Sequence, residues 1–114
     1  MGYIYLASPY SDASPNVMSA RFVLACKVAG ELLERGEVVF SPIAHGHPIS
    51  LYSGAARDWR FWANSCREMI GLASKVIVVR MPGWDKSKGV AAEIAIALEL
   101  GKPVEYMDLE GAGE

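Results

Sequence analysis

The chain has 114 residues, of which 52% are hydrophobic and 21% charged, and its formal net charge at pH 7 is −2. This length favours a single domain, and the slightly acidic balance argues against a nucleic-acid polymer as partner. No run approaches the roughly 20 apolar residues of a membrane span, and the first apolar run is too short for a signal peptide. We therefore expect a cytoplasmic globular protein, with one domain over residues 1–108 and a flexible tail over residues 109–114.

Strand-like and helix-like segments alternate along the chain. The strand-like segments are short apolar runs rich in β-branched and aromatic residues, whereas apolar residues recur every three to four positions in the helix-like ones. Strands are predicted at residues 3–7, 37–41, 75–80 and 102–107, helices at residues 15–35, 56–71 and 86–100, and a loop at residues 43–54.

Capping residues and cysteines fit this assignment. Ser14 followed by Pro15 is a good helix start, because a hydroxyl caps free N–H groups and proline suits the first helical position. Gly36 and Gly101 suit the left-handed residue that ends many helices, and the proline at the start of the last strand is typical of an edge strand. The two cysteines, at positions 26 and 66, lack metal spacing and are predicted to be reduced core residues.

The order β-α-β-α-β-α-β predicts the fold class. It indicates a three-layer α/β/α domain, Rossmann-like (flavodoxin-like), with a parallel sheet of four to five strands. In such folds the ligand binds outside the carboxyl ends of the strands. Three segments should meet at that edge, Ser8–Ser11, Ser41–His47 and Pro82–Gly89, and all are rich in glycine, hydroxyl or imidazole groups.

The turn that follows the third predicted strand is the most informative segment. It leads directly into a helix, whose free N–H groups can bind an anion or a sugar. Glu93 falls on the first or second turn of that helix, where a carboxylate would lie near a ligand. The residues alone leave two interpretations open, a single acidic catalyst or a solvated helix carboxylate.

Three motifs resemble those of the nucleoside 2-deoxyribosyltransferase superfamily, which includes the deoxynucleoside 5′-monophosphate N-glycosidases. They are Ser87-x-Gly89-x-x-x-Glu93 after a strand, Ile4-Tyr5-Leu6-Ala7 in the first strand, and Gly101-Lys102-Pro103-Val104. The resemblance extends from residue 4 to residue 104. It is strongest to a branch of short, mostly uncharacterised bacterial and phage proteins.

The resemblance implies roles for particular residues. Glu93 matches the glutamate that attacks the anomeric carbon, and Tyr5 matches a tyrosine that holds this glutamate by a hydrogen bond. A carboxylate suits an oxocarbenium-like transition state. Ser87 and Gly89 match positions that receive a 5′-phosphate, although Ser87 alone could be a plain helix cap. Ser8 lies where the first loop touches the sugar or phosphate. No metal and no organic cofactor is implied.

Other candidate substrate-binding residues each have an alternative role. Tyr10 lies in the first loop. His45 and His47 could contact the base or sugar or simply pack in their loop, and two ligands are too few for a metal site. Trp84 could stack on a base or seal a dimer. Asp58 could serve for an aspartate that the superfamily often has before the third strand, or could be a helix-start charge.

That aspartate is missing from the matching stretch, residues 64–68. The first hypothesis is therefore hydrolysis of a (deoxy)nucleoside 5′-monophosphate, and the alternatives are base exchange by a nucleoside 2-deoxyribosyltransferase or a non-catalytic nucleotide-binding module. Residues 82–93 match a phosphoribohydrolase signature only in part, because residues 84–88 depart from it. With three tryptophans in so small a domain, we also expect a homodimer or larger homo-oligomer.

Overall fold

A four-stranded parallel sheet forms the centre of the computed structural model, which describes residues 2–53 and 59–109. The strand order is β2-β1-β3-β4, as in flavodoxin-like folds. In the described ranges the strands are β1 (Ile4–Ala7), β2 (Val39–Phe40), β3 (Lys75–Val79) and β4 (Val104–Met107). The predicted fold class is confirmed, and the strand that begins after Pro103 is at the edge of the sheet.

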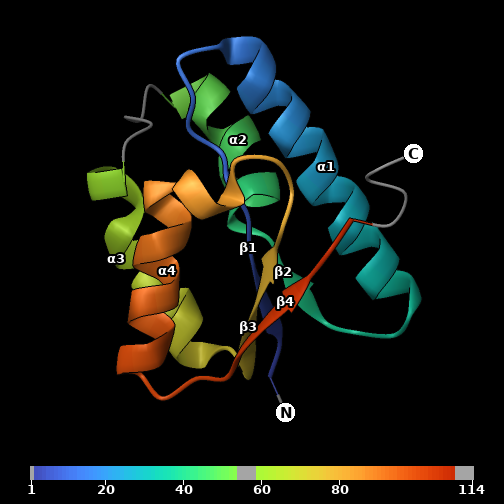
Figure 1. Ribbon diagram of the computed structural model, residues 1–114, viewed down its shortest axis with the longest axis vertical. Coiled ribbons are helices and arrows are strands. Elements are labelled where there is room, and N and C mark those ends of the chain that lie inside the picture. The colour runs from blue at the N-terminus through green and yellow to red at the C-terminus, as the bar shows by residue number, and fades with distance from the viewer. Residues whose placement is uncertain (1, 54–58, 110–114) are drawn as a thin grey trace.

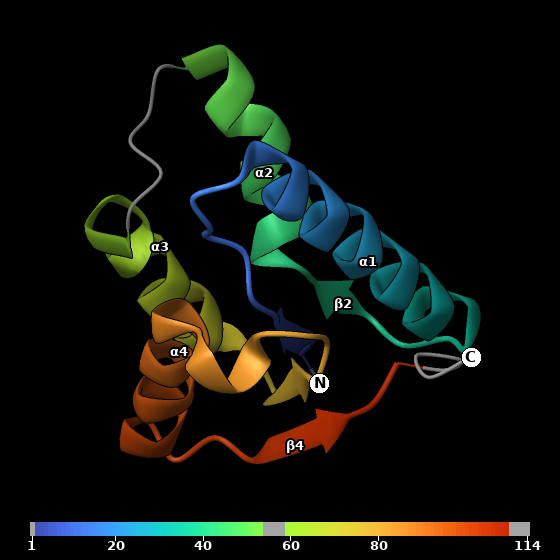
Figure 2. The same cartoon turned by 45° about the horizontal axis from the view of Figure 1, so that its top comes forward.

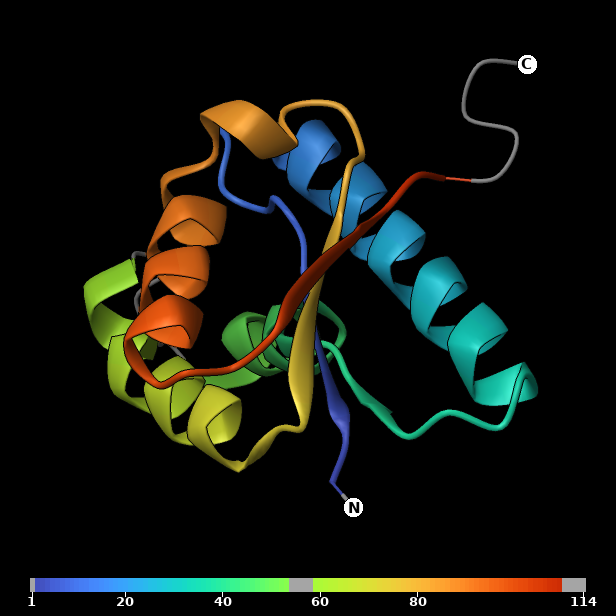
Figure 3. The same ribbon diagram turned by 60° about the horizontal axis from the view of Figure 1, so that its bottom comes forward.

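Helices cover both faces of this sheet. They are α1 (Pro15–Glu34), α2 (Pro42–Ser53), α3 (Trp59–Leu72) and α4 (Lys88–Glu99), and a 3₁₀ turn, η1 (Trp84–Lys86), precedes α4. Figure 3 shows α1 on one side of the strands and α3 with α4 on the other. Figure 2 shows α2 beside α1. No helix in the described ranges is long and apolar enough to cross a membrane.

Two apolar clusters hold these layers together, and alternate residues of β1 point into each. Tyr5 and Ala7 face the cluster under α3 and α4, whereas Ile4 and Leu6 face the cluster under α1. Because side chains alternate across a strand, a β1 with all four residues buried must be covered on both faces. This places the hydroxyl of Tyr5 on the side where α4 lies.

The predicted helix boundaries rest on caps that the structure contains. The hydroxyl of Ser14 accepts a hydrogen bond from the amide of Val17 at 3.4 Å, and α1 begins at Pro15. Gly36 and Gly101 adopt positive φ angles of 89° and 72° directly after α1 and α4. Each end therefore uses the residue type that its backbone conformation requires.

The prediction of a loop over residues 43–54 was wrong, because α2 occupies Pro42–Ser53. Ser41 and Pro42 are the same start signal that opens α1, and the hydroxyl of Ser41 accepts from the amide of Ala44 at 3.1 Å. Gly46 and Pro48 argued against a helix. Gly46, however, lies close to the indole of Trp62, and a Cβ there would come within 3.6 Å of that ring.

One core prediction was also wrong. Cys26 is exposed on α1, whereas Cys66 on α3 is buried as expected, and both are free thiols. On α1 the buried positions are Ala25, Val28 and Leu32. These follow helical spacing, so a residue one position after Ala25 turns by about 100° away from the sheet.

Candidate active site

A cavity of about 740 Å³ lies at the carboxyl ends of the strands. Figure 1 shows the starts of α2 and α4 at this end of the sheet. The three segments predicted to converge, residues 8–11, 41–47 and 82–89, all contribute to the wall. The lining residues are Ser8, Tyr10, Ser11, Pro42, Ile43, Gly46, His47, Ser50, Trp62, Cys66, Lys86, Ser87, Lys88, Gly89 and Glu93.

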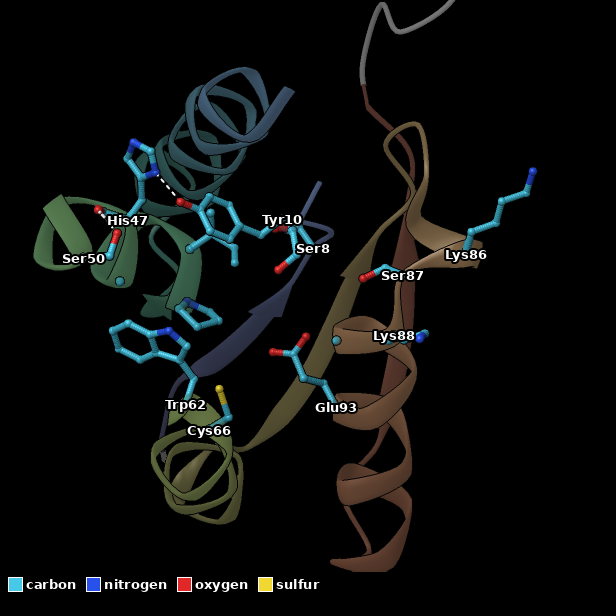
Figure 4. Close-up of a pocket in the computed structure, with 15 residues that line it drawn as sticks. Ser8, Tyr10, His47, Ser50, Trp62, Cys66, Lys86, Ser87, Lys88 and Glu93 are labelled. Carbon is cyan, nitrogen blue, oxygen red and sulfur yellow. Dashed lines mark hydrogen bonds between the residues drawn. The ribbon is translucent and has the colours of Figure 1, made fainter. Parts of the chain in front are cut away.

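Glu93 is the one carboxyl group among these described lining residues. It lies on α4 with 4% of its surface exposed, and its side chain points into the cavity in Figure 4. The fully buried Tyr5 of β1 donates a hydrogen bond from its hydroxyl to Oε2 of Glu93. This bond joins residues from two elements, and it orients one carboxyl oxygen while the other stays available.

Burial controls the protonation of this pair. Loss of solvent raises the pKa of Glu93 to about 8, although the hydrogen bond from Tyr5 opposes that rise. Burial, and then the charge of Glu93, raises the pKa of Tyr5 far above its ordinary value. Tyr5 therefore keeps its proton and acts as a donor, while Glu93 exchanges a proton close to neutral pH.

The start of α4 forms a second wall. Ser87 is its N-cap, and the Ser87 hydroxyl accepts from the amide of Val90 at 3.2 Å. Gly89 lies in the first turn, and Lys86 and Lys88 flank Ser87 with exposed side chains. A helix start with a hydroxyl, a residue without side chain and two cations suits an anionic group.

Ser8 provides an unsatisfied polar group in the same cavity. Its side chain is 3% exposed, and its hydroxyl oxygen has no hydrogen-bond partner among the described residues. A buried hydroxyl without a partner costs free energy, of the order of 1–3 kcal/mol. A ligand atom that accepted or donated a hydrogen bond at Ser8 would remove that cost.

Tyr10 and His47 form a pair on the wall opposite α4. The Tyr10 hydroxyl and Nδ1 of His47 are 2.6 Å apart, and Figure 4 shows this bond at the side of the cavity that α2 forms. The His47 ring also stacks on Phe22 of α1, with 4.3 Å between centroids and 26° between planes. Arg21 donates to the backbone carbonyls of Tyr10 and Ser11 at 3.3 and 3.0 Å.

The model of a family described as "Domain of unknown function (DUF1937)" matches residues 2–109. The chain belongs to this family. No curated protein sequence matches the chain.

One solved structure of an enzyme is similar to the fold of this chain. It is that of a 2-deoxyribosyltransferase from the psychrotolerant bacterium Bacillus psychrosaccharolyticus, with 27% sequence identity and a TM-score of 0.67. The similarity covers 98% of this chain and 74% of that enzyme's chain. The resemblance predicted from the sequence motifs is thereby confirmed, and this chain shares the fold of a 2-deoxyribosyltransferase.

Several predicted site residues lie in the cavity wall and others do not. Tyr5 donates a hydrogen bond to the wall residue Glu93, and Ser8, Tyr10, Ser87 and Gly89 line the cavity. Their roles toward a ligand stay predictions.

Two further candidates lie elsewhere. His45 is exposed, with its ring 5.4 Å from the ring of Phe40. Trp84 lies edge-on against Tyr106 of β4, with 5.7 Å between centroids. Neither is among the lining residues. Asp58 lies outside the described residues.

Ser50, Trp62 and Cys66 line the cavity but lie outside the segments predicted to converge, and Lys86 and Lys88 lie inside one of those segments without having been singled out. The sequence signal for α2 is the spacing of its lining residues. Positions 43, 46, 47 and 50 recur every three to four residues, which is the pattern of one helix face. Reading the segment as a loop concealed that face.

Proposed function

We propose that this protein cleaves the N-glycosidic bond of a (deoxy)nucleoside 5′-monophosphate, with Glu93 as nucleophile and water as final acceptor. The observation that carries the proposal is the buried carboxyl group of Glu93, aimed into a cavity and held by the hydroxyl of Tyr5. The similarity to a 2-deoxyribosyltransferase supports the choice of a nucleoside-like substrate.

The proposed chemistry has two steps. One oxygen of Glu93 bonds to the anomeric carbon as the bond from that carbon to the base breaks, and the electron pair of the broken bond goes to the base. The carboxylate stabilises the positive charge that develops on the sugar. Water then attacks the same carbon and releases Glu93. The bond from Tyr5 orients the carboxylate for both steps.

The start of α4 supports the choice of a phosphorylated substrate. Ser87, Gly89 and the unpartnered hydroxyl of Ser8 line one cavity with Glu93. A 5′-phosphate placed against Ser87 would meet free backbone N–H groups and the positive end of the helix dipole. Lys86 and Lys88 add positive charge to the same wall.

Base release tests the proposal directly. Purified protein, Glu93→Ala and Glu93→Gln are incubated with ribo- and deoxynucleosides and their 5′-monophosphates, and free base is measured by chromatography. We expect release by the parent and a loss of at least 10³-fold in both variants, because each removes the nucleophile. The rate should rise between pH 6 and 8, because the carboxylate of Glu93 becomes more populated as pH approaches its pKa of about 8.

Ligand-induced shifts in melting temperature accompany this assay. A rise with a nucleotide but no release from any member of the panel would contradict catalysis and favour a nucleotide-binding module. Equal release by the parent and both Glu93 variants would exclude Glu93 as nucleophile.

The Ser87→Ala variant tests whether Ser87 binds the 5′-phosphate of the substrate. We expect KM for the 5′-monophosphate to rise about tenfold, because one hydrogen bond to a charged group is lost, with kcat/KM for the free nucleoside unchanged. Ser87 also caps α4. Ser87→Asp therefore serves as a matched variant that keeps the cap and repels the phosphate. Equal effects of both variants on nucleoside and nucleotide would contradict phosphate recognition.

Base exchange is the second candidate function, and the similarity to a 2-deoxyribosyltransferase favours it. In that case a second base would replace water as the acceptor at the glycosyl intermediate. Adding a different free base to the reaction and looking for a new nucleoside distinguishes the two outcomes. A new nucleoside formed faster than free sugar would establish transfer.

A further inference from the structure

Departure of the base requires an acid that Glu93 cannot supply. In the reaction proposed above, the carboxylate of Glu93 is consumed as nucleophile. The leaving base takes up an electron pair and needs a proton, and such proton transfer contributes about 10²–10⁴-fold in enzymes. No second carboxyl group lies among the described residues that line the cavity.

The wall opposite α4 carries a pair suited to that task. The hydroxyl of Tyr10 is 2.6 Å from Nδ1 of His47, and both residues line the cavity that contains Glu93. Figure 4 shows the pair at the side of the cavity that α2 forms, with Glu93 and the start of α4 on the other side. Histidine is the side chain that most readily holds and releases a proton near neutral pH, and a tyrosine bonded to it can pass that proton on.

Both members of the pair are held in place. The His47 ring lies between Phe22, stacked at 4.3 Å, and Tyr10, whose ring is edge-on at 5.6 Å between centroids. The backbone of Tyr10 is fixed by the hydrogen bond that its carbonyl accepts from Arg21. A preorganised donor of this kind loses little conformational freedom when it acts.

Other polar groups in the wall are less suited. Burial raises the pKa of the Cys66 thiol to about 11, so that thiol is a poor acid for a neutral base. Serine hydroxyls are weaker acids still. Lys86 and Lys88 flank Ser87 at the start of α4, and their side chains are exposed. The pair of Tyr10 and His47 lies on the opposite wall.

We propose that Tyr10 donates a proton to the departing base and is reprotonated by His47. As Glu93 bonds to the anomeric carbon and the carbon–base bond breaks, the base takes the proton of the Tyr10 hydroxyl. Nδ1–H of His47 returns a proton to Tyr10 while Nε2 of the same ring takes one from solvent. In the second step water adds to the sugar, its surplus proton passes back to His47 through Tyr10 as Nε2 releases one to solvent, and the Glu93 carboxylate is regenerated.

Leaving groups of different acidity test this proposal. The preferred nucleotide of the base-release panel is compared with an analogue whose base can leave with little or no help from a proton donor. For a purine this is the 7-methylguanine nucleotide, which already carries a positive charge, and for a pyrimidine the 5-fluorouracil nucleotide. The variants are Tyr10→Phe, His47→Gln, Asp58→Asn and Glu93→Gln. Tyr52→Phe serves as control, since Tyr52 is on α2 with 91% exposure.

We expect Tyr10→Phe and His47→Gln to lower kcat on the ordinary nucleotide about 10²-fold, but less than tenfold on the activated analogue. A merely structural role would slow both substrates alike. Tyr52→Phe should match the parent on both, and Glu93→Gln should lose both. Melting curves of all variants show whether they fold.

Three results would overturn the proposal while leaving the nucleophile role of Glu93 intact. These are equal losses on both substrates in Tyr10→Phe, no loss on either substrate, or a selective loss in Asp58→Asn with Tyr10→Phe unaffected. Absence of Glu93-dependent release by the parent would instead overturn the proposed function, and this proposal with it.

Discussion

At the scale of single residues, Glu93 has the most unusual environment in the described chain. A carboxyl group with 4% exposure lies against the hydroxyl of Tyr5 and a cavity wall. Burial raises its pKa from the ordinary 4.5 to about 8. A protein that keeps such a group gives up stability at neutral pH, which is common at functional sites.

The pH dependence of stability tests this environment. Between pH 4.5 and 8 the folded state keeps a proton on Glu93 that the unfolded state has released. The stability that this proton provides is complete below pH 4.5 and is lost as pH rises through 8. Glu93→Gln has no such proton, so we expect its free energy of unfolding to fall less steeply over this window. The difference should reach a few kcal/mol.

Urea unfolding of the parent and of Glu93→Gln at pH 5, 6, 7 and 8 measures how the difference in their free energies of unfolding changes with pH. Other titrating groups contribute equally to both proteins, so only the difference between the two curves matters. Parallel curves would show that Glu93 titrates near its ordinary value in the folded protein.

At the scale of secondary-structure elements, the loops after β1 and β3 are joined through α1. Arg21 donates to the carbonyls of Tyr10 and Ser11, and its guanidinium lies against Gly83. Gly83 has a φ of 91°, and a Cβ there would collide with Nη2 of Arg21. The backbone conformation therefore requires glycine here, and the flexible end of Arg21 would have to move aside for a Cβ.

Gly83→Ala should therefore lower the free energy of unfolding by about 1–2 kcal/mol, mainly from backbone strain and partly from displacing the end of Arg21. Gly36→Ala is the matched control, because Gly36 has a φ of 89° with no atom within 4 Å of an added Cβ. It should show the strain alone, about 1 kcal/mol. Urea unfolding provides both values.

A double-mutant cycle with Arg21→Ala separates the two causes. If the collision contributes, Gly83→Ala should cost less in the Arg21→Ala background than in the parent. Additive effects, or equal costs at Gly83 and Gly36, would show that the guanidinium moves away freely.

At the scale of the whole molecule, the described surface retains large apolar side chains. Leu72 at the end of α3 is 68% exposed, and Leu98 near the end of α4 is 66% exposed. These two helices pack against each other, so their ends can offer one apolar surface to another molecule. A small domain buries little apolar surface, so large exposed apolar side chains are typical of an interaction surface.

We therefore predict that the protein is a homodimer or larger in solution. Light scattering coupled to gel filtration at micromolar concentration should give at least twice the chain mass of 12.3 kDa. Leu72→Glu with Leu98→Glu should shift the mass towards 12.3 kDa if this surface is the contact. Leu33→Glu on α1, also exposed, is the control. A parent protein of 12.3 kDa at that concentration would contradict the prediction.

Local chemistry determined much of this protein from sequence alone. Ser14 with Pro15, Gly36 and Gly101 marked helix ends, because capping and left-handed φ angles depend on residues close in the chain. The order of strands and helices was enough to predict a parallel sheet and the edge at which a ligand would bind. The site at that edge includes Glu93 because it follows β3 by little more than one loop and one helical turn.

Only the tertiary structure decided which side chains meet. The bond between Tyr5 and Glu93 joins residues 88 positions apart; the family resemblance implied it, but no local pattern in this sequence contains it. The two histidines of α2 show the same limit on a smaller scale. Residues two apart on a helix point about 200° apart, so a helical segment can bring His47 to the cavity only by turning His45 away. The packing of α2 against α1 and β1 made that choice.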